Sequence, residues 1–232
     1  MNPTQGVLSE AWAMYKAHWQ HLLPIALVVY LAVGLVSLVL TLLLDNWAAG
    51  ILAALVSLIA TFWLQGALVK AVDDVRDGRP DLSLGETFAG VRPQLVAIIV
   101  AGVLAALGVI LGLILLIIPG LYLLTRWILI IPVIVLEGRT AGESFGRSWE
   151  LVRGFAWNVF GVIVLTILIL IGFRIALDIV LFPLSNEIQS LLTELIAGTL
   201  ATPFAVLAWT LLYFRLREAK EPAAVPAPAP TV

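Results

Sequence analysis

The sequence predicts an all-α, polytopic membrane helix bundle, with six transmembrane helices arranged as three hairpins and a short interfacial amphipathic helix before each hairpin. Three observations predict this class. Hydrophobic residues make up 62% of the 232 residues and charged residues 12%, whereas soluble domains hold roughly 45–50% and 25%. Six apolar runs are each long enough to cross a hydrocarbon core of ~30 Å as a helix. The basic residues gather between alternate runs.

The six apolar runs set the order of the predicted helices. They lie near residues 22–44, 47–70, 94–118, 121–137, 155–182 and 188–214. The third and fourth runs need a break, because one helix from residue 94 to 137 would be about 60 Å long at 1.5 Å per residue. Pro119-Gly120 supplies one, since proline lacks an N–H donor and glycine tolerates turn conformations. We therefore predict a tight hairpin there; the alternative is a re-entrant or tilted segment, giving five spans.

The distribution of positive charge predicts the orientation. Cytoplasmic loops of membrane proteins collect Lys and Arg. Of the 13 basic residues, all except Arg126 and Arg174 fall in the N-terminal segment, in the connections after the second and fourth spans, or after the sixth span. The three opposite turns hold none. This partition predicts that both termini are cytoplasmic. It favours six spans, because five would place the termini on opposite sides.

The segments that precede the hairpins resemble one another. Residues 83–88 read Ser-Leu-Gly-Glu-Thr-Phe and residues 140–145 read Thr-Ala-Gly-Glu-Ser-Phe. Each fits a capping box, in which a hydroxyl and the Glu three residues later bind each other's free backbone N–H groups. We expect helices over 83–92 and 140–153, and the second is amphipathic. A weaker third copy begins at Thr4.

The domain organisation and the exclusions follow from composition. Residues 1–218 form one six-helix transmembrane domain, and residues 219–232 form a disordered Pro/Ala-rich cytoplasmic tail. The absence of cysteine excludes a thiolate metal site and a thiol nucleophile. A net charge of −2 carries no signal for a nucleic-acid partner. Common hydrolase and nucleotide-binding motifs are also absent. We therefore predict no catalytic, metal-binding or cofactor-binding residues.

Residues 119–154 carry motifs that point to a family. They contain Pro-Gly-Leu-Tyr, then Pro-Val-Ile-Val-Leu-Glu-Gly, then Ser-Phe-Gly-Arg-Ser-Trp-Glu-Leu-Val-Arg-Gly. These strings resemble the membrane domain of glycerophosphoryl diester phosphodiesterases, most strongly over about residues 83–160. In some bacterial enzymes that domain precedes a catalytic domain, and it also occurs alone. The catalytic domain's His-Arg-Gly and acidic metal-binding motifs are absent here, so the resemblance implies a stand-alone bacterial inner-membrane module without phosphodiesterase activity.

The resemblance and the composition together suggest two functions. The first is a non-enzymatic inner-membrane protein that organises or interacts with membrane lipids or a membrane-protein partner, such as a separate phosphodiesterase. The second is a small secondary transporter or lipid-handling carrier. The two differ in whether the charges within the spans pair with one another or line a cavity.

Four ionisable residues within the spans form a candidate intramembrane polar cluster, because charges in hydrocarbon are costly and often functional. The cluster comprises Arg126, Arg174, Asp178 and Glu194, all expected in the outer third of the bilayer. One interpretation pairs Arg174 with Asp178 and Arg126 with Glu194. A second is a periplasm-facing cavity that holds an anionic group through the two arginines. A third is proton coupling through Asp178 or Glu194.

A second candidate site is the cytoplasmic interfacial motif. It comprises Glu137, Arg147, Ser148, Trp149 and Arg153. In one interpretation, Arg147 pairs with Glu137 or Glu143 and docks the interfacial helix on the bundle. In the other, the arginine and tryptophan side chains bind anionic lipid headgroups, as basic and aromatic helices at that surface do.

Overall fold

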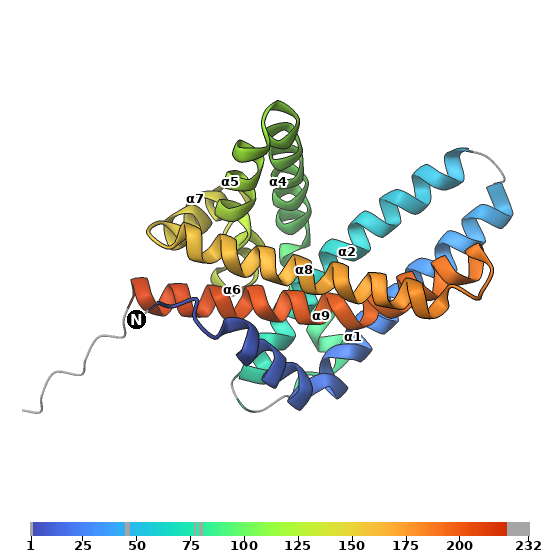
Figure 1. The fold of residues 1–232 in the computed structure, drawn as a ribbon, viewed down its shortest axis with the longest axis horizontal. Helices are drawn as coiled ribbons and strands as arrows, with labels where there is room; N and C mark the ends of the chain where they lie inside the picture. Colours follow the sequence, from blue (N-terminus) through green and yellow to red (C-terminus); the bar gives the residue numbers. More distant parts are fainter. Residues whose placement is uncertain (1, 45–46, 77, 79–80, 222–232) are drawn as a thin grey trace, which may run out of the picture.

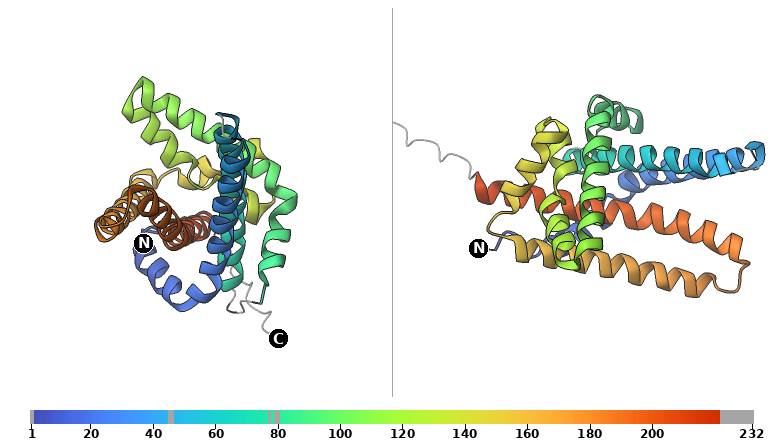
Figure 2. Two further views of the ribbon diagram at one scale, coloured as in Figure 1. Left: turned by 90° about the vertical axis from the view of Figure 1, so that its right-hand side faces the viewer. Right: turned by 90° about the horizontal axis from the view of Figure 1, so that it is seen from above.

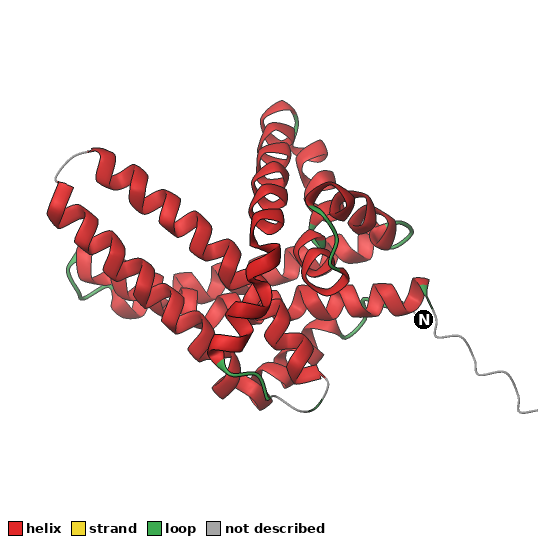
Figure 3. Cartoon of the chain, turned by 180° about the vertical axis from the view of Figure 1, so that it is seen from behind, coloured by secondary structure: helices red, strands yellow, loops and turns green. Residues whose placement is uncertain are grey.

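A computed structural model describes residues 2–44, 47–76, 78 and 81–221, and every regular element in these ranges is helical (Figure 3). The elements are α1 (Val7–Leu44), α2 (Trp47–Arg76), α3 (Leu84–Val91), the 3-10 turn η1 (Arg92–Gln94), α4 (Leu95–Leu115), α5 (Ile117–Trp127), α6 (Ile130–Glu137), α7 (Ala141–Val152), α8 (Ala156–Leu181) and α9 (Asn186–Lys220). Six helical stretches among the described residues are long and apolar enough to cross a membrane, which confirms the six predicted runs.

The long helices lie in pairs that point away from a shared centre (Figure 1). The helices α1 and α2 lie side by side, as do α4 and α5, and α8 and α9. The α4–α5 pair stands crosswise to the α8–α9 pair, and Figure 2 shows the same separation from two further sides. The outer parts of these pairs expose large apolar side chains, including Leu115 and Ile118. An apolar surface this extensive needs lipid around it.

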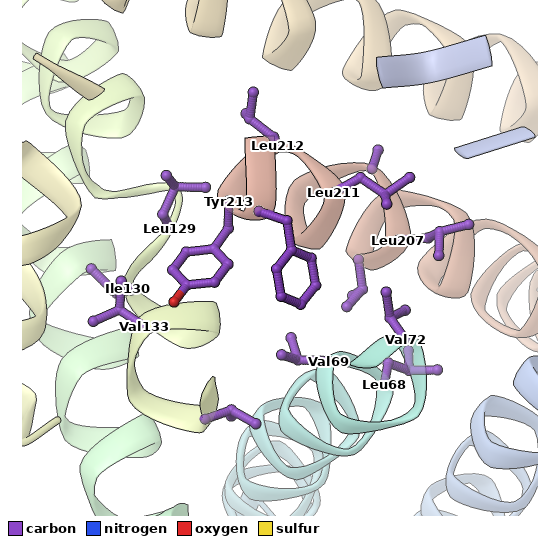
Figure 4. Close-up of a cluster of buried hydrophobic side chains, with 14 of the residues drawn as sticks. Leu68, Val69, Val72, Leu129, Ile130, Val133, Leu207, Leu211, Leu212 and Tyr213 are labelled. Atoms are coloured by element: carbon purple, nitrogen blue, oxygen red, sulfur yellow. The ribbon is translucent and has the colours of Figure 1, made fainter. Parts of the chain in front are cut away.

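The main core lies where the pairs meet, and α9 runs through it. Leu207, Leu211 and Tyr213 of α9 are almost completely buried. Figure 4 shows Tyr213 pointing toward Ile130 and Val133 of α6. The first part of α1 also packs along α9. The centre is therefore held together by apolar packing between helices far apart in the sequence.

Both strong capping boxes are confirmed. The Ser83 hydroxyl accepts a hydrogen bond from the Glu86 N–H, and the Glu86 carboxylate accepts one from the Ser83 N–H; Thr140 and Glu143 form the same pair. These contacts begin α3 and α7. The third copy has a different N-terminal contact, because the Thr4 hydroxyl donates to Asn2 Oδ1. The helix that follows it, α1, bends at His18, whose backbone is not helical.

The turn between the third and fourth spans lies a few residues earlier than predicted. The chain reverses at Leu116, whose backbone is extended, and Pro119 and Gly120 already lie in the first turn of α5. Proline is tolerated there because the first N–H groups of a helix have no partner within it. Gly120 instead allows close packing: a Cβ on Gly112 of α4 would lie 2.9 Å from the Gly120 Cα.

Two further boundaries differ from the prediction. The fourth span is not one helix, because α5 ends at Trp127 and α6 begins at Ile130. At the C-terminal end, α9 continues to Lys220, two residues into the segment predicted as a tail. Residues 222–232 lie outside the described residues.

The α4–α5 contact generates a stability prediction. Gly112→Ala should lower the melting temperature in detergent, because the new methyl group meets backbone rather than a flexible side chain; overpacking of this kind costs about 1–3 kcal/mol. The matched control is Gly172→Ala in the middle of α8, where a Cβ meets nothing within 4 Å and alanine is the better helix former. Equal melting temperatures for the two variants would contradict the close contact.

Candidate functional site

The Glu137 carboxylate connects three helices. It lies at the end of α6, where Gly138 ends the helix with a positive φ of 65°. Both of its oxygens accept hydrogen bonds from Arg147 Nε of α7, each at 3.0 Å, and Oε1 also accepts one from the Tyr213 hydroxyl of α9 at 2.9 Å. The Glu137 side chain is only 10% exposed. Of the two partners that the sequence allows for Arg147, the structure therefore selects Glu137.

Arg147 extends this network to the end of α9. Its Nη2 donates to Glu221 at 2.6 Å, and its Nη1 lies 3.4 Å from Glu150. Burial lowers the pKa of Arg147, but its hydrogen bonds to Glu221 and Glu137 outweigh burial and raise the pKa above its ordinary value. The hydrogen bond from Arg147 likewise lowers the pKa of the Glu221 carboxyl. This part of the interfacial motif therefore docks α7 on α6 and α9.

Ser148 and Trp149, the next two residues of α7, face α5 instead. The Ser148 hydroxyl donates to the Arg126 carbonyl at 2.7 Å, which satisfies a backbone group at the broken end of α5. The Arg126 guanidinium lies 4.7 Å from the centre of the Trp149 ring and 5.1 Å from the centre of the Tyr122 ring. These two rings meet edge to face. Arg126 is thus held against α7 by cation–π contacts.

Arg126 also lines a groove between α5 and the start of α8. The groove has a volume of about 620 Å³. Its lining residues are Ile118, Leu121, Tyr122, Thr125, Arg126, Gly154, Ala156, Trp157, Asn158 and Phe160. Arg126 Nε and Nη1 are buried without a hydrogen-bond partner. Within the described residues Arg126 forms no ion pair, so its charge is met only by the two aromatic rings.

The structure does not bring the four residues of the intramembrane polar cluster together as predicted. Arg174 pairs with Glu194 at 3.4 Å rather than with Asp178, while Asp178 Oδ1 accepts a hydrogen bond from the Thr193 hydroxyl at 2.9 Å. These residues all belong to the α8–α9 pair. Arg126 lies apart from them against α7, because the break after Trp127 turns α5 toward that helix.

The first residues of the chain and the ends of α2 and α9 meet near the interfacial motif. Arg215 near the end of α9 binds Glu10 and the Gln5 carbonyl of the N-terminal segment. Arg76 at the end of α2 binds Glu218 at 2.6 Å. These contacts bring the first residues, the end of α2 and the end of α9 to one end of the molecule, as Figure 1 shows for the N-terminus and α9.

Comparison with known proteins identifies the family. The family model of the membrane domain of glycerophosphoryl diester phosphodiesterase matches residues 98–216. The chain belongs to this family. No curated protein and no solved structure matches it. The matched part of this membrane domain runs from α4 into α9 and includes Arg126, Glu137 and Arg147, but not the first three helices.

Sequence reasoning missed several members of these sites in the membrane domain. Tyr122 lies four residues before Arg126, and this spacing on a helix could have indicated their contact. Tyr213 and Glu221 left no comparable signal, because each meets its partner only through the tertiary fold. Arg153, which the sequence placed in the interfacial motif, has an exposed side chain and makes no ion pair among the described residues.

The Glu137–Arg147 pair gives a second stability prediction. Arg147→Ala should leave the Glu137 carboxylate, only 10% exposed, without its main counter-charge, and losing one member of a buried pair costs about 3 kcal/mol or more. The melting temperature in detergent should fall by several degrees, whereas the matched control Arg153→Ala should change it little. The double variant Glu137→Leu/Arg147→Leu should recover part of the loss. A fall as large in Arg153→Ala would contradict the docking role.

The capping box of α7 gives a pH prediction. The Thr140 backbone N–H and then the Thr140 hydroxyl lower the pKa of Glu143 below its ordinary value of 4.5. A lowered pKa means that the carboxylate stabilises the folded helix above pH 4.5 and loses this effect as the pH falls through the lowered value. Amide hydrogen exchange at Glu143 and Ser144 should accelerate over that range relative to Glu143→Gln at the same pH. If the exchange rates of the wild type and of Glu143→Gln changed with pH in the same way, the capping contribution would be refuted.

Proposed function

We propose that this membrane domain is a non-enzymatic protein of the bacterial inner membrane that binds and organises lipids at the cytoplasmic surface. One observation carries the proposal. At the junction of α5, α7 and α8, the Arg126 cation lies among aromatic side chains, beside a mainly apolar groove, and it has no carboxylate partner within the described ranges. A cation among aromatic residues at the membrane surface is the chemistry that recognises anionic lipid headgroups.

The contacts between the ends of the chain support the topology in this proposal. The ion pairs of Arg215, Arg76 and Arg147 gather the N-terminal segment, the end of α2, α7 and the end of α9. These are the segments in which the basic residues concentrate, and such segments are cytoplasmic. In the proposal both termini lie on that side, and the six spans form three hairpins.

Exposed tryptophans support a surface position for the helices before the hairpins. Trp12 and Trp19 lie in and next to the part of α1 before the His18 bend, and both are about half exposed. Trp157 at the start of α8 is 84% exposed. Tryptophan concentrates at the boundary between headgroups and hydrocarbon. We therefore place the first part of α1, α3 and α7 along the cytoplasmic interface.

A carrier function through the intramembrane polar cluster has less support. It needs both arginines in one cavity, but Arg126 lies against α7, and Arg174 pairs with Glu194. Among the described residues, no three His, Asp or Glu side chains come together as a metal site requires. A separate phosphodiesterase is a natural membrane partner for the proposed lipid-binding role, since the family takes its name from that enzyme.

Reporter fusions test the topology. Fusions after Arg92, Arg153 and Lys220 should report a cytoplasmic location, and a fusion after Ser185 should report a periplasmic one, because the basic residues flank the first three points only. A periplasmic signal after Lys220 would refute six spans with both ends cytoplasmic.

Lipid dependence tests the function. Exhaustive detergent exchange of the purified protein should lower its melting temperature, and added bacterial phospholipid should restore it, because a ligand that binds only the folded state stabilises it. The same preparation should release no glycerol phosphate from glycerophosphodiesters. A melting temperature insensitive to lipid, or hydrolysis that tracks the purified chain, would overturn the proposal.

A further inference from the structure

We propose that the groove between α5 and the start of α8 is a binding site for one anionic glycerophospholipid. The phosphate binds at Arg126, and part of an acyl chain lies along the apolar wall. This inference rests on the proposed lipid-binding function and names the ligand and its site. Neither of the two sites predicted from the sequence includes this groove, because the sequence grouped Arg126 with Arg174, Asp178 and Glu194 and not with the start of α8.

The unmet hydrogen-bonding capacity of Arg126 is the first argument. Nε and Nη1 are buried and have no acceptor in the part of the chain that the structure describes, although a guanidinium carries five N–H donors. The Tyr122 and Trp149 rings attract the positive charge but accept no strong hydrogen bond. The contact with Ser148 uses the Arg126 carbonyl and not its side chain. A phosphate group suits this cation, because its oxygens accept charge-assisted hydrogen bonds from guanidinium N–H groups.

The charge and shape of the groove are the second argument. Of its ten lining residues none is acidic and only Arg126 is charged, so the groove is complementary to a single negative charge. Thr125 is already satisfied by the Leu121 carbonyl. Most of the other residues are apolar. The volume of about 620 Å³ lies within the range of ligand sites, and it suits a phosphate with the first part of a chain rather than a whole lipid.

The start of α8 supplies a further positive potential. Ala156, Trp157 and Asn158 form the first turn of this 26-residue helix, and all three line the groove. The N-cap residue is Phe155, whose side chain cannot accept a hydrogen bond from that turn. Free N–H groups and the helix dipole both favour an anion at such a position. The anion therefore has attractive groups on both sides of the groove.

The surroundings of the groove favour a lipid over free phosphate. Ile118 is 80% exposed and Trp157 is 84% exposed, and both are lining residues. In a membrane these side chains face acyl chains or the headgroup boundary. A free phosphate would satisfy Arg126 but leave the apolar wall uncovered. A phospholipid satisfies both, because its charge and its chains are joined in one molecule.

Native mass spectrometry of the full chain in neutral detergent tests the proposal with defined lipids. The probes are phosphatidylglycerol and phosphatidylcholine with identical chains, together with inorganic phosphate as a competitor. We expect one phosphatidylglycerol per chain, preferred by about tenfold over phosphatidylcholine. Both lipids carry the phosphodiester anion, but the choline cation of phosphatidylcholine would add a second positive charge to a groove that already holds Arg126 and no acidic residue. Inorganic phosphate should not displace it.

Variants at Arg126 test whether this residue binds the lipid. Arg126→Gln should reduce the preference by about tenfold. Arg126→Lys, which keeps the charge and the cation–π contacts, should reduce it less, because lysine lacks the planar fork. The matched control Arg92→Gln removes a charge from an exposed arginine at the same predicted surface and should change nothing. If Arg126→Gln fails to fold, the lysine variant and the two lipids decide the question.

The outcomes separate this site from the general function. Equal binding of both lipids, or an unchanged preference in the Arg126 variants, would overturn the site even if added lipid still restores the melting temperature. Displacement by inorganic phosphate would show that the groove takes a free anion and not a lipid. A wild-type protein that retains no lipid and melts alike with and without lipid would overturn both proposals.

Discussion

The Glu137 carboxylate joins α6, α7 and α9, and the arrangement of this end of the bundle depends on it. It accepts two hydrogen bonds from Arg147 and one from Tyr213, whose ring lies in the core and whose hydroxyl reaches the edge of that core. A carboxylate with this little exposure is stable only when its oxygens are matched by donors. The pair therefore sets where α7 lies, and α7 in turn positions Trp149 and Ser148 against α5.

The break between α5 and α6 divides one predicted span into two helices that pack against different neighbours. Val133 and Ile134 of α6 are buried in the core. In contrast, α5 contacts α7 through Arg126 and through Trp127. The Trp127 ring packs edge to face on Phe145 of α7. Where a helix is interrupted within a packed bundle, its free backbone groups need hydrogen-bond partners on neighbouring elements. The Ser148 hydroxyl is such a partner for the Arg126 carbonyl. The same interruption brings the Arg126 guanidinium to the groove that the first turn of α8 also lines.

The two arginines within the spans illustrate how differently one residue type can be used. Arg174 pairs with Glu194 of the neighbouring helix, and both side chains are more than half exposed. Arg126 has aromatic neighbours but no carboxylate among the described residues, and two of its nitrogens are buried. A paired charge is explained by its partner. An arginine without a carboxylate partner retains capacity for an anionic ligand, and this difference directs the lipid proposal to Arg126.

The sequence by itself determined the class of protein, the number of candidate spans, the two capping boxes and the family. These are local properties: apolar runs, a hydroxyl and a glutamate three residues apart, and contiguous strings of motif residues. It also offered Glu137 and Glu143 as partners for Arg147, beside the alternative of lipid headgroups, but it could not choose among them.

Only the tertiary structure decided the rest. Pro119 and Gly120 mark an interruption in the sequence, but whether they form the turn or pack after it depends on how closely α4 and α5 approach at Gly112. One interpretation paired Arg174 with Asp178 and Arg126 with Glu194, but Arg174 pairs with Glu194 and Arg126 lies against α7. The first pairing relied on a spacing of four residues within one helix. The second relied on depths counted along straight and continuous spans, whereas α5 breaks from α6. The groove beside Arg126 is formed by residues more than 25 positions apart, which no local pattern connects.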